Sequence, residues 1–156
     1  MKVPTDKYPQ EETGIFQIKI SPPVPVDKVP DNHLIVKNIY ISIDATMRVW
    51  ISGVQSYLPP VKPQDVMRAL CVGKVLYSKS KKYKVGDLVM GMIGWQKYAV
   101  LPAKEVNLIP AEYPNPEHFL GVLGISGLTA YIGVHEIGKI KKDDIVVISA
   151  AAGAVG

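Results

Sequence analysis

The chain has 156 residues, of which 47% are hydrophobic and 21% charged, as in an ordinary globular protein that buries a core. Its single cysteine, Cys71, excludes an intrachain disulfide and a multi-cysteine zinc site, and its position in an apolar run indicates a buried, unreactive thiol. Thirteen prolines and thirteen glycines favour strands and turns over a helix bundle.

The formal net charge of +4 is mild and does not predict a nucleic-acid partner. Four lysines lie close together in residues 79–84, and Gly86-Asp87 then opens a new apolar run, which favours a solvated turn. A contact with phosphate or nucleic acid is the alternative for this cluster. No run approaches the length of a membrane span, and residues 1–10 lack the apolar core of a signal peptide, so we expect a cytoplasmic protein that does not enter membranes.

Strand signals follow one another through the first two thirds of the chain. Apolar alternation and β-branched residues predict strands at residues 15–20, 34–42, 67–77, 88–92 and 97–101. Residues 44–50 are expected to form a short turn or helix, and the long loop 52–64 is a candidate wall of a site. Short strands with regular turns predict a closed or partly closed β-barrel.

The pattern changes after Pro110. A helix is predicted to begin at Pro116, and residues 128–137 have helical spacing that ends at Gly138. Residues 145–149 are continuously apolar, which is typical of a strand buried on both faces of a parallel sheet.

The last six residues, Ala151-Ala152-Gly153-Ala154-Val155-Gly156, follow that apolar run at once. A buried strand that leads into A-x-G-x-x-G is typical of the opening of a dinucleotide-binding unit. Small residues allow the sharp turn there and let the backbone approach a pyrophosphate. A tight turn without a ligand is the alternative, since the following helix and the ribose-binding residue lie beyond the sequence.

Four segments together resemble one known family. They are residues 42–50 (S-x-D-P-Y-M-R in the family), 67–75 with 84–87 (barrel strands), 123–131 (L-G-M-P-G-L-T-A-Y) and 150–156 (A-A-A-G-A-V-G). In this order and spacing they are similar to the zinc-free medium-chain reductases of the leukotriene B4 12-hydroxydehydrogenase and prostaglandin reductase family. That family includes the NADPH-dependent 2-alkenal, or double-bond, reductases.

The resemblance implies an α+β, mainly β protein. It places a GroES-like β-barrel catalytic domain at residues 1–111, linking helices at 112–144, and the start of a truncated Rossmann NADP-binding domain at 145–156. It further implies reduction by NADPH, without zinc, of the carbon–carbon double bond of α,β-unsaturated aldehydes and ketones such as 2-alkenals or 15-oxoprostaglandins. Full-length members of the family are usually homodimers.

The resemblance also assigns site residues, although none to catalysis and none to a metal. Tyr57, Ile93 and Trp95 match positions of the substrate pocket, whereas the positions that match the coenzyme site are Thr129, Gly153, Ala154, Val155 and Gly156. An exposed loop position is the alternative for Tyr57, core packing for Trp95, and capping of a helix N-terminus for Thr129.

Two segments depart from the family pattern. Asp44-Ala45-Thr46 lacks a proline and an aromatic ring, and Ile125-Ser126 lacks a methionine that approaches the coenzyme. These changes bear on substrate fit and coenzyme stacking and leave the fold as predicted. Because the helix beyond Gly156 is missing from the sequence, we expect the chain alone to bind NADPH poorly and to be inactive. The alternatives are a non-catalytic, reductase-derived subunit of a larger assembly, and completion of the coenzyme domain by another chain.

Overall fold

The structure, a computed structural model, describes residues 16–22 and 24–156, and the chain divides into two compact units after Ile109. The first unit is mainly β, as the strand signals predict, and forms a half-barrel of antiparallel strands. The second unit, residues 110–156, contains short helices followed by an irregular segment.

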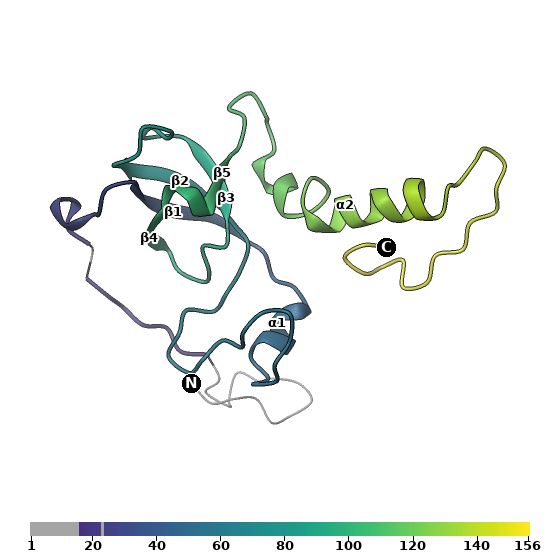
Figure 1. Cartoon of the computed structure of the whole chain (residues 1–156), viewed down its shortest axis with the longest axis horizontal. Coiled ribbons are helices and arrows are strands. Elements are labelled where there is room, and N and C mark those ends of the chain that lie inside the picture. The colour runs from purple at the N-terminus through teal and green to yellow at the C-terminus, as the bar shows by residue number, and fades with distance from the viewer. Residues whose placement is uncertain (1–15, 23) are drawn as a thin grey trace. The chain divides into compact units, whose positions relative to one another are not determined.

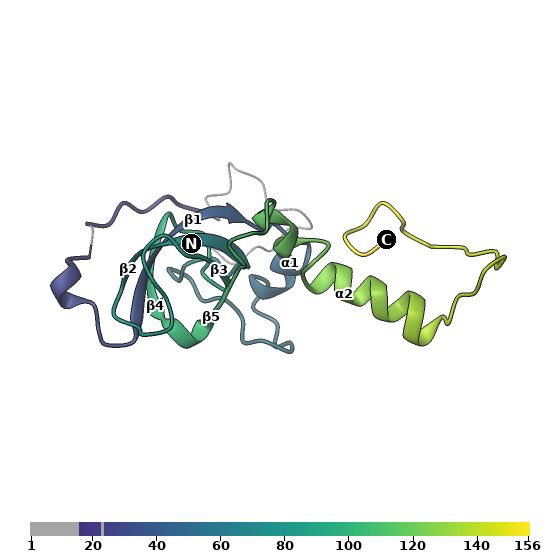
Figure 2. The same ribbon diagram turned by 90° about the horizontal axis from the view of Figure 1, so that it is seen from above.

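One antiparallel sheet organises the first unit, with the strand order β4-β1-β2-β3-β5. Figure 1 shows these strands side by side, and Figure 2 shows the same unit from above. The strands are β1 (His33–Ile41), β2 (Cys71–Ser78), β3 (Leu88–Gly91), β4 (Tyr98–Pro102) and β5 (Val106–Leu108). Four of them confirm the predictions at 34–42, 67–77, 88–92 and 97–101, although β2 begins four residues later than expected.

The core lies on one face of this sheet and is built from alternate residues of the strands. Leu34 and Val36 of β1 are fully buried, as are Val75 of β2 and Val89 of β3. Because successive side chains of a strand point to opposite faces, Lys74 and Leu76 of β2 lie on the other face and are exposed, whereas Val72 on that face is fully buried. On β1 the alternation ends near Asn38, where the pairing with β2 shifts register.

A short helix closes one end of the core. Helix α1 (Thr46–Trp50) confirms the predicted turn or helix and buries Met47 and Trp50 against the strands. Two 3-10 turns, η2 (Val26–Lys28) and η3 (Ala103–Glu105), stand before β1 and between β4 and β5.

The strand predicted at residues 15–20 is wrong for its described part. Residues 16–20 pair with no strand among the described residues, and Ile18 and Ile20 are 99% and 94% exposed. Alternation of apolar and polar residues marks a possible strand, but a strand also needs a neighbour to bond its backbone groups. Residue 15 lies outside the described part of the chain.

Strand β5 is the opposite case: it forms part of the sheet, although the sequence pattern does not predict a strand there. This strand pairs with β3 through Val89 and Leu108 and through Gly91 and Val106. Three residues are too few to show a period, so only the finished sheet defines the strand.

The second unit holds the 3-10 helix η4 (Pro116–Leu120), helix α2 (Ile125–Tyr131) and the π-helical turn η5 (Ile132–Ile137), which ends at Gly138. The helical spacing of 128–137 is therefore confirmed, with an earlier start. The strand expected at 145–149 does not form: Ile145 is 95% and Val147 90% exposed, and these residues join no sheet among those described. A strand needs at least one neighbouring strand to pair with its backbone, and residues 110–156 contain none.

Candidate functional site

A tight loop between β3 and β4 forms the centre of the candidate site. We call residues 93–97 the Trp95 loop. The backbone N–H of Gly94 donates to the carbonyl of Ala69 at 3.1 Å, and that of Trp95 donates to the carbonyl of Met67 at 2.8 Å. Gly94 has φ +84°, and a Cβ on it would lie 2.9 Å from the Met67 oxygen, so the loop needs glycine here.

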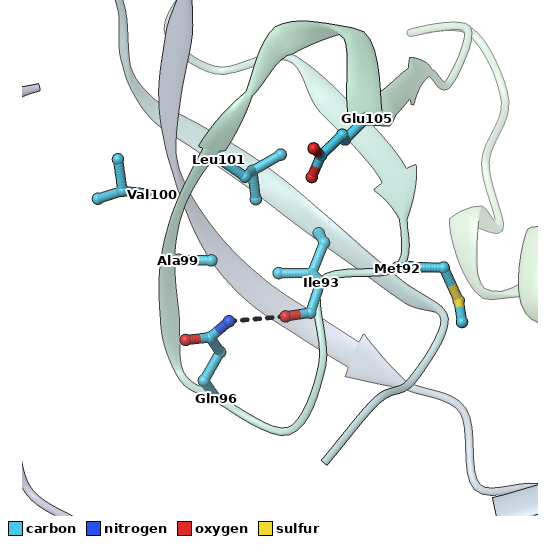
Figure 3. Close-up of a pocket in the computed structure, with 7 residues that line it drawn as sticks. All are labelled: Met92, Ile93, Gln96, Ala99, Val100, Leu101 and Glu105. Carbon is cyan, nitrogen blue, oxygen red and sulfur yellow. Dashed lines mark hydrogen bonds between the residues drawn. The ribbon is translucent and has the colours of Figure 1, made fainter. Parts of the chain in front are cut away.

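On one side of the loop lies a small cavity of about 190 Å³, which we call the Glu105 hollow. Figure 3 shows the Glu105 carboxylate directed toward Leu101 and Ile93, with Gln96 at the opposite end. The Gln96 amide donates to the carbonyl of Ile93 at 2.7 Å and so braces the loop from within. The remaining lining residues are Met92, Ala99 and Val100.

On the other side lies a larger and more open hollow of about 500 Å³, which we call the β1 hollow. Three isoleucines line it, Ile39 and Ile41 at the end of β1 and Ile43 just beyond the strand. Trp95 forms one wall, and its ring centroid lies 5.1 Å from that of Phe16. The polar residues of its lining are Asn38, Gln96 and Lys97.

The structure separates the three residues expected in the substrate pocket. Ile93 is buried and lines the Glu105 hollow, whereas Trp95 lines the β1 hollow on the other side of the same loop. Tyr57 lines neither hollow; it is 71% exposed in the loop after α1, where its hydroxyl accepts a hydrogen bond from the Trp50 indole.

Two further residues of the site were missed by the sequence reading. Gln96 lines both hollows, and Asn38 bonds the Trp95 loop from the neighbouring strand. A signal for Asn38 does exist, since asparagine is a poor strand former and here it interrupts a run of β-branched residues. No comparable signal marks Gln96.

The only thiol lies beneath the Trp95 loop. Cys71 is fully buried, and its Sγ donates to the carbonyl of Gly94 at 3.4 Å. Burial raises the pKa of the Cys71 thiol to about 11, so the group stays protonated and unreactive near neutral pH. Among residues 16–22 and 24–156, no three His, Cys, Asp or Glu side chains lie close enough together to hold a metal ion.

The residues expected at the coenzyme lie in the second unit. The Thr129 hydroxyl donates to the carbonyl of Ile125 at 2.7 Å, so Thr129 lies inside α2 and does not cap its N-terminus. The Gly153 N–H donates to the carbonyl of Ala150 at 2.8 Å, within an exposed turn.

A pyrophosphate needs free N–H groups at the start of a helix. In the described turn, Gly153 uses its own N–H in the bond to Ala150. No helix in the described ranges is both long enough and apolar enough to span a lipid bilayer.

Comparison with known proteins places the chain in a family. Residues 7–109 match the N-terminal domain of oxidoreductase. The chain is 39% identical over 133 residues to a 2-alkenal reductase (NADP(+)-dependent) of Nicotiana tabacum, a match that covers 83% of this chain and 39% of the relative. It is 36% identical to the NADPH-dependent curcumin reductase of Escherichia coli strain K12, covering 81% of this chain and 36% of that one.

Solved structures agree with these matches. CurA from Vibrio vulnificus, crystallised in complex with NADPH, superposes with a TM-score of 0.77 at 33% identity, covering 88% of this chain and 40% of that one. The chain thus spans about two fifths of the length of the relatives it matches. It belongs to the family of oxidoreductase N-terminal domains, in the alkenal and prostaglandin reductase branch of the medium-chain reductases.

Proposed function

We propose that this chain is the substrate-side domain of an NADPH-dependent reductase that acts on the carbon–carbon double bond of α,β-unsaturated aldehydes and ketones. The 39% identity to a tobacco 2-alkenal reductase over 83% of the chain is the observation that carries this proposal. In it, the half-barrel is a GroES-like catalytic domain, and residues 145–156 open a Rossmann domain whose remainder lies in the other three fifths of the relatives' length.

The β1 hollow is the surface where we place the substrate. Three isoleucines and Trp95 give it a mainly apolar lining, to which Asn38, Gln96 and Lys97 add polar groups. A conjugated enone has the matching chemistry, since it is flat and apolar with one acceptor oxygen. Of the residues expected in the substrate pocket, Trp95 would contact the substrate directly in this proposal. Ile93 would not contact it, but belongs to the same loop as Trp95.

For the coenzyme, we propose that Gly153, Ala154, Val155 and Gly156 contact the pyrophosphate, and Thr129 the nicotinamide end, once the rest of a coenzyme domain is present. In the described chain the N–H of Gly153 bonds the Ala150 carbonyl, so contact with a pyrophosphate would require this turn to open.

The test is an NMR titration of the 156-residue chain with benzylideneacetone, an aryl enone, followed through the indole N–H resonances. We expect the Trp95 resonance to shift and that of Trp50, which is buried in the core, to stay in place. Ile41→Asn should weaken binding, because it places an amide in the apolar lining of the hollow. Leu76→Asn is the matched control, since Leu76 is 42% exposed on β2, Ile41 is 39% exposed on β1, and Leu76 lines neither hollow.

Two results would count against the proposal. If Ile41→Asn and Leu76→Asn weaken enone binding equally, the β1 hollow is not the binding surface. If a polypeptide of the relatives' full length binds NADPH but neither binds nor reduces an enone, the alternative of a non-catalytic, reductase-derived subunit takes its place.

A further inference from the structure

Asn38 extends the pairing between β1 and β4 beyond the point where the two strands separate. The ladder ends at Lys37 and Tyr98, and the next backbone N–H, that of Asn38, still donates to the carbonyl of Lys97 at 3.0 Å. No further backbone hydrogen bond joins β1 to the Trp95 loop among the described residues. The side-chain amide of Asn38 bonds the backbone of the loop there instead.

The Asn38 amide binds the carbonyls on both sides of Trp95. Its Nδ2 donates to the Gly94 oxygen at 3.0 Å and to the Gln96 oxygen at 2.8 Å. One side chain therefore fixes the orientation of both peptide groups next to the tryptophan, as an extra strand would.

The neighbourhood of Asn38 is adapted to this role. Gly73 of β2 lies opposite it, and a Cβ on Gly73 would stand 3.3 Å from the Asn38 Oδ1 and would overlap the Val36 side chain. A larger residue at position 73 would collide with Val36 and would crowd the Asn38 oxygen, so glycine leaves room for both side chains.

The indole of Trp95 does not set its own position by a polar contact. Its Nε1 is buried and has no hydrogen-bond partner among the described residues. The ring is held by apolar packing, against Phe16 and the core, and by the backbone of the loop that carries it, which Asn38 bonds on one side and residues 67–69 bond on the other.

We propose that Asn38 is a positioning residue, which fixes Trp95 as the wall of the β1 hollow and thereby sets the affinity of the hollow for its ligand. The part that concerns affinity rests on the proposed function; the part that concerns Trp95 does not.

The test compares Asn38→Asp with a reference protein that has Asn38. Both proteins carry Trp50→Phe, so that Trp95 is the one tryptophan left of the two in the sequence. Aspartate has the size of asparagine but lacks the two N–H groups. We expect Trp95 emission to shift to longer wavelength and acrylamide quenching to rise, and affinity for benzylideneacetone to fall about tenfold. Asn107→Asp, an exposed change of the same kind on β5, should alter none of these.

A double-mutant cycle with Trp95→Ala decides whether Asn38 acts through the tryptophan. If it does, Asn38→Asp costs no further affinity once Trp95 is gone. An equal loss in both backgrounds, or unchanged Trp95 fluorescence in Asn38→Asp, would overturn the proposal. Should Asn38→Asp fail to fold, Asn38→Ser retains one donor and is expected to give smaller changes in the same direction.

Failure of the proposed function gives a different result. If the unchanged chain does not bind the enone, the substrate assignment falls, and the fluorescence of Trp95 in Asn38→Asp alone decides the positioning role.

Discussion

The indole Nε1 of Trp50 donates a hydrogen bond to the hydroxyl oxygen of Tyr57 across 3.2 Å. Trp50 ends helix α1 with its ring in the core, while most of Tyr57 is exposed in the following loop. The contact therefore fastens the long loop after α1 to the body of the half-barrel. Tyr57 has a structural role here, and its contact with a substrate stays a prediction.

Removal of this hydroxyl should destabilise the fold slightly. Tyr57→Phe leaves the Trp50 N–H without its acceptor in a partly buried place, which costs about 1 kcal/mol of the free energy of unfolding. Urea unfolding followed by circular dichroism measures the change. Tyr40→Phe is the control, because Tyr40 is 42% exposed and its hydroxyl has no hydrogen bond in the described structure. Equal loss in both variants would show that the bond contributes nothing.

Two glycines with positive φ should differ in their tolerance of alanine. Gly86 has φ +98° and open space around it, so Gly86→Ala meets only the backbone penalty of about 1–2 kcal/mol. Gly94→Ala meets that penalty and also a contact with the Met67 oxygen at 2.9 Å. We expect it to cost clearly more in chemical unfolding and to shift the Trp95 indole resonance. A smaller cost for Gly94→Ala than for Gly86→Ala would refute the account of the Trp95 loop.

The buried thiol should make stability fall at alkaline pH. Burial raises the pKa of Cys71 from 9.0 to about 11, so the folded chain holds this proton more tightly than the unfolded chain. The resulting stabilisation is complete below the unfolded value and is lost as pH rises through the folded one. The free energy of unfolding should therefore decline more steeply between these pH values in the unchanged chain than in Cys71→Ala. In addition, iodoacetamide at about pH 8 should modify Cys71 only after unfolding.

The carboxylate before α1 should act in the opposite direction on pH. Asp44 Oδ1 accepts the backbone N–H of Thr46 at 2.7 Å, and hydrogen bonds from Thr46 lower the pKa of Asp44 below its usual 3.8. Its stabilisation is present above the unfolded pKa and is lost as pH falls through the folded one. Asp44→Ala should destabilise the chain by about 1 kcal/mol at neutral pH and by less in acid.

The comparison with Asp44→Asn separates charge from hydrogen bonding. The amide oxygen can still accept the Thr46 N–H, so this variant should be less destabilised than Asp44→Ala at neutral pH and should lose the acid dependence. Acid titration of thermal unfolding measures both effects, and an identical pH profile in the unchanged chain and Asp44→Asn would contradict the assigned pKa.

Local patterns in the sequence were enough to locate most of the half-barrel. The β-branched run at Leu34–Ile41 and the apolar runs of β2, β3 and β4 have the period of strands, and α1 follows from the turn after Asp44. The same reasoning failed at residues 16–20 and 145–149, where the pattern of a strand is present but no neighbouring strand is. It also failed at β5, which is too short to have a pattern.

The sequence by itself determined the family and the mainly β architecture, because these depend on local periodicity and on motifs in a fixed order. Only the tertiary structure decided that Ile93 and Trp95 face different hollows and that Asn38, 56 residues before Gly94, holds the loop between them. Hydrogen bonds between residues so far apart depend on how the strands pair and where they separate, and no local pattern encodes that geometry.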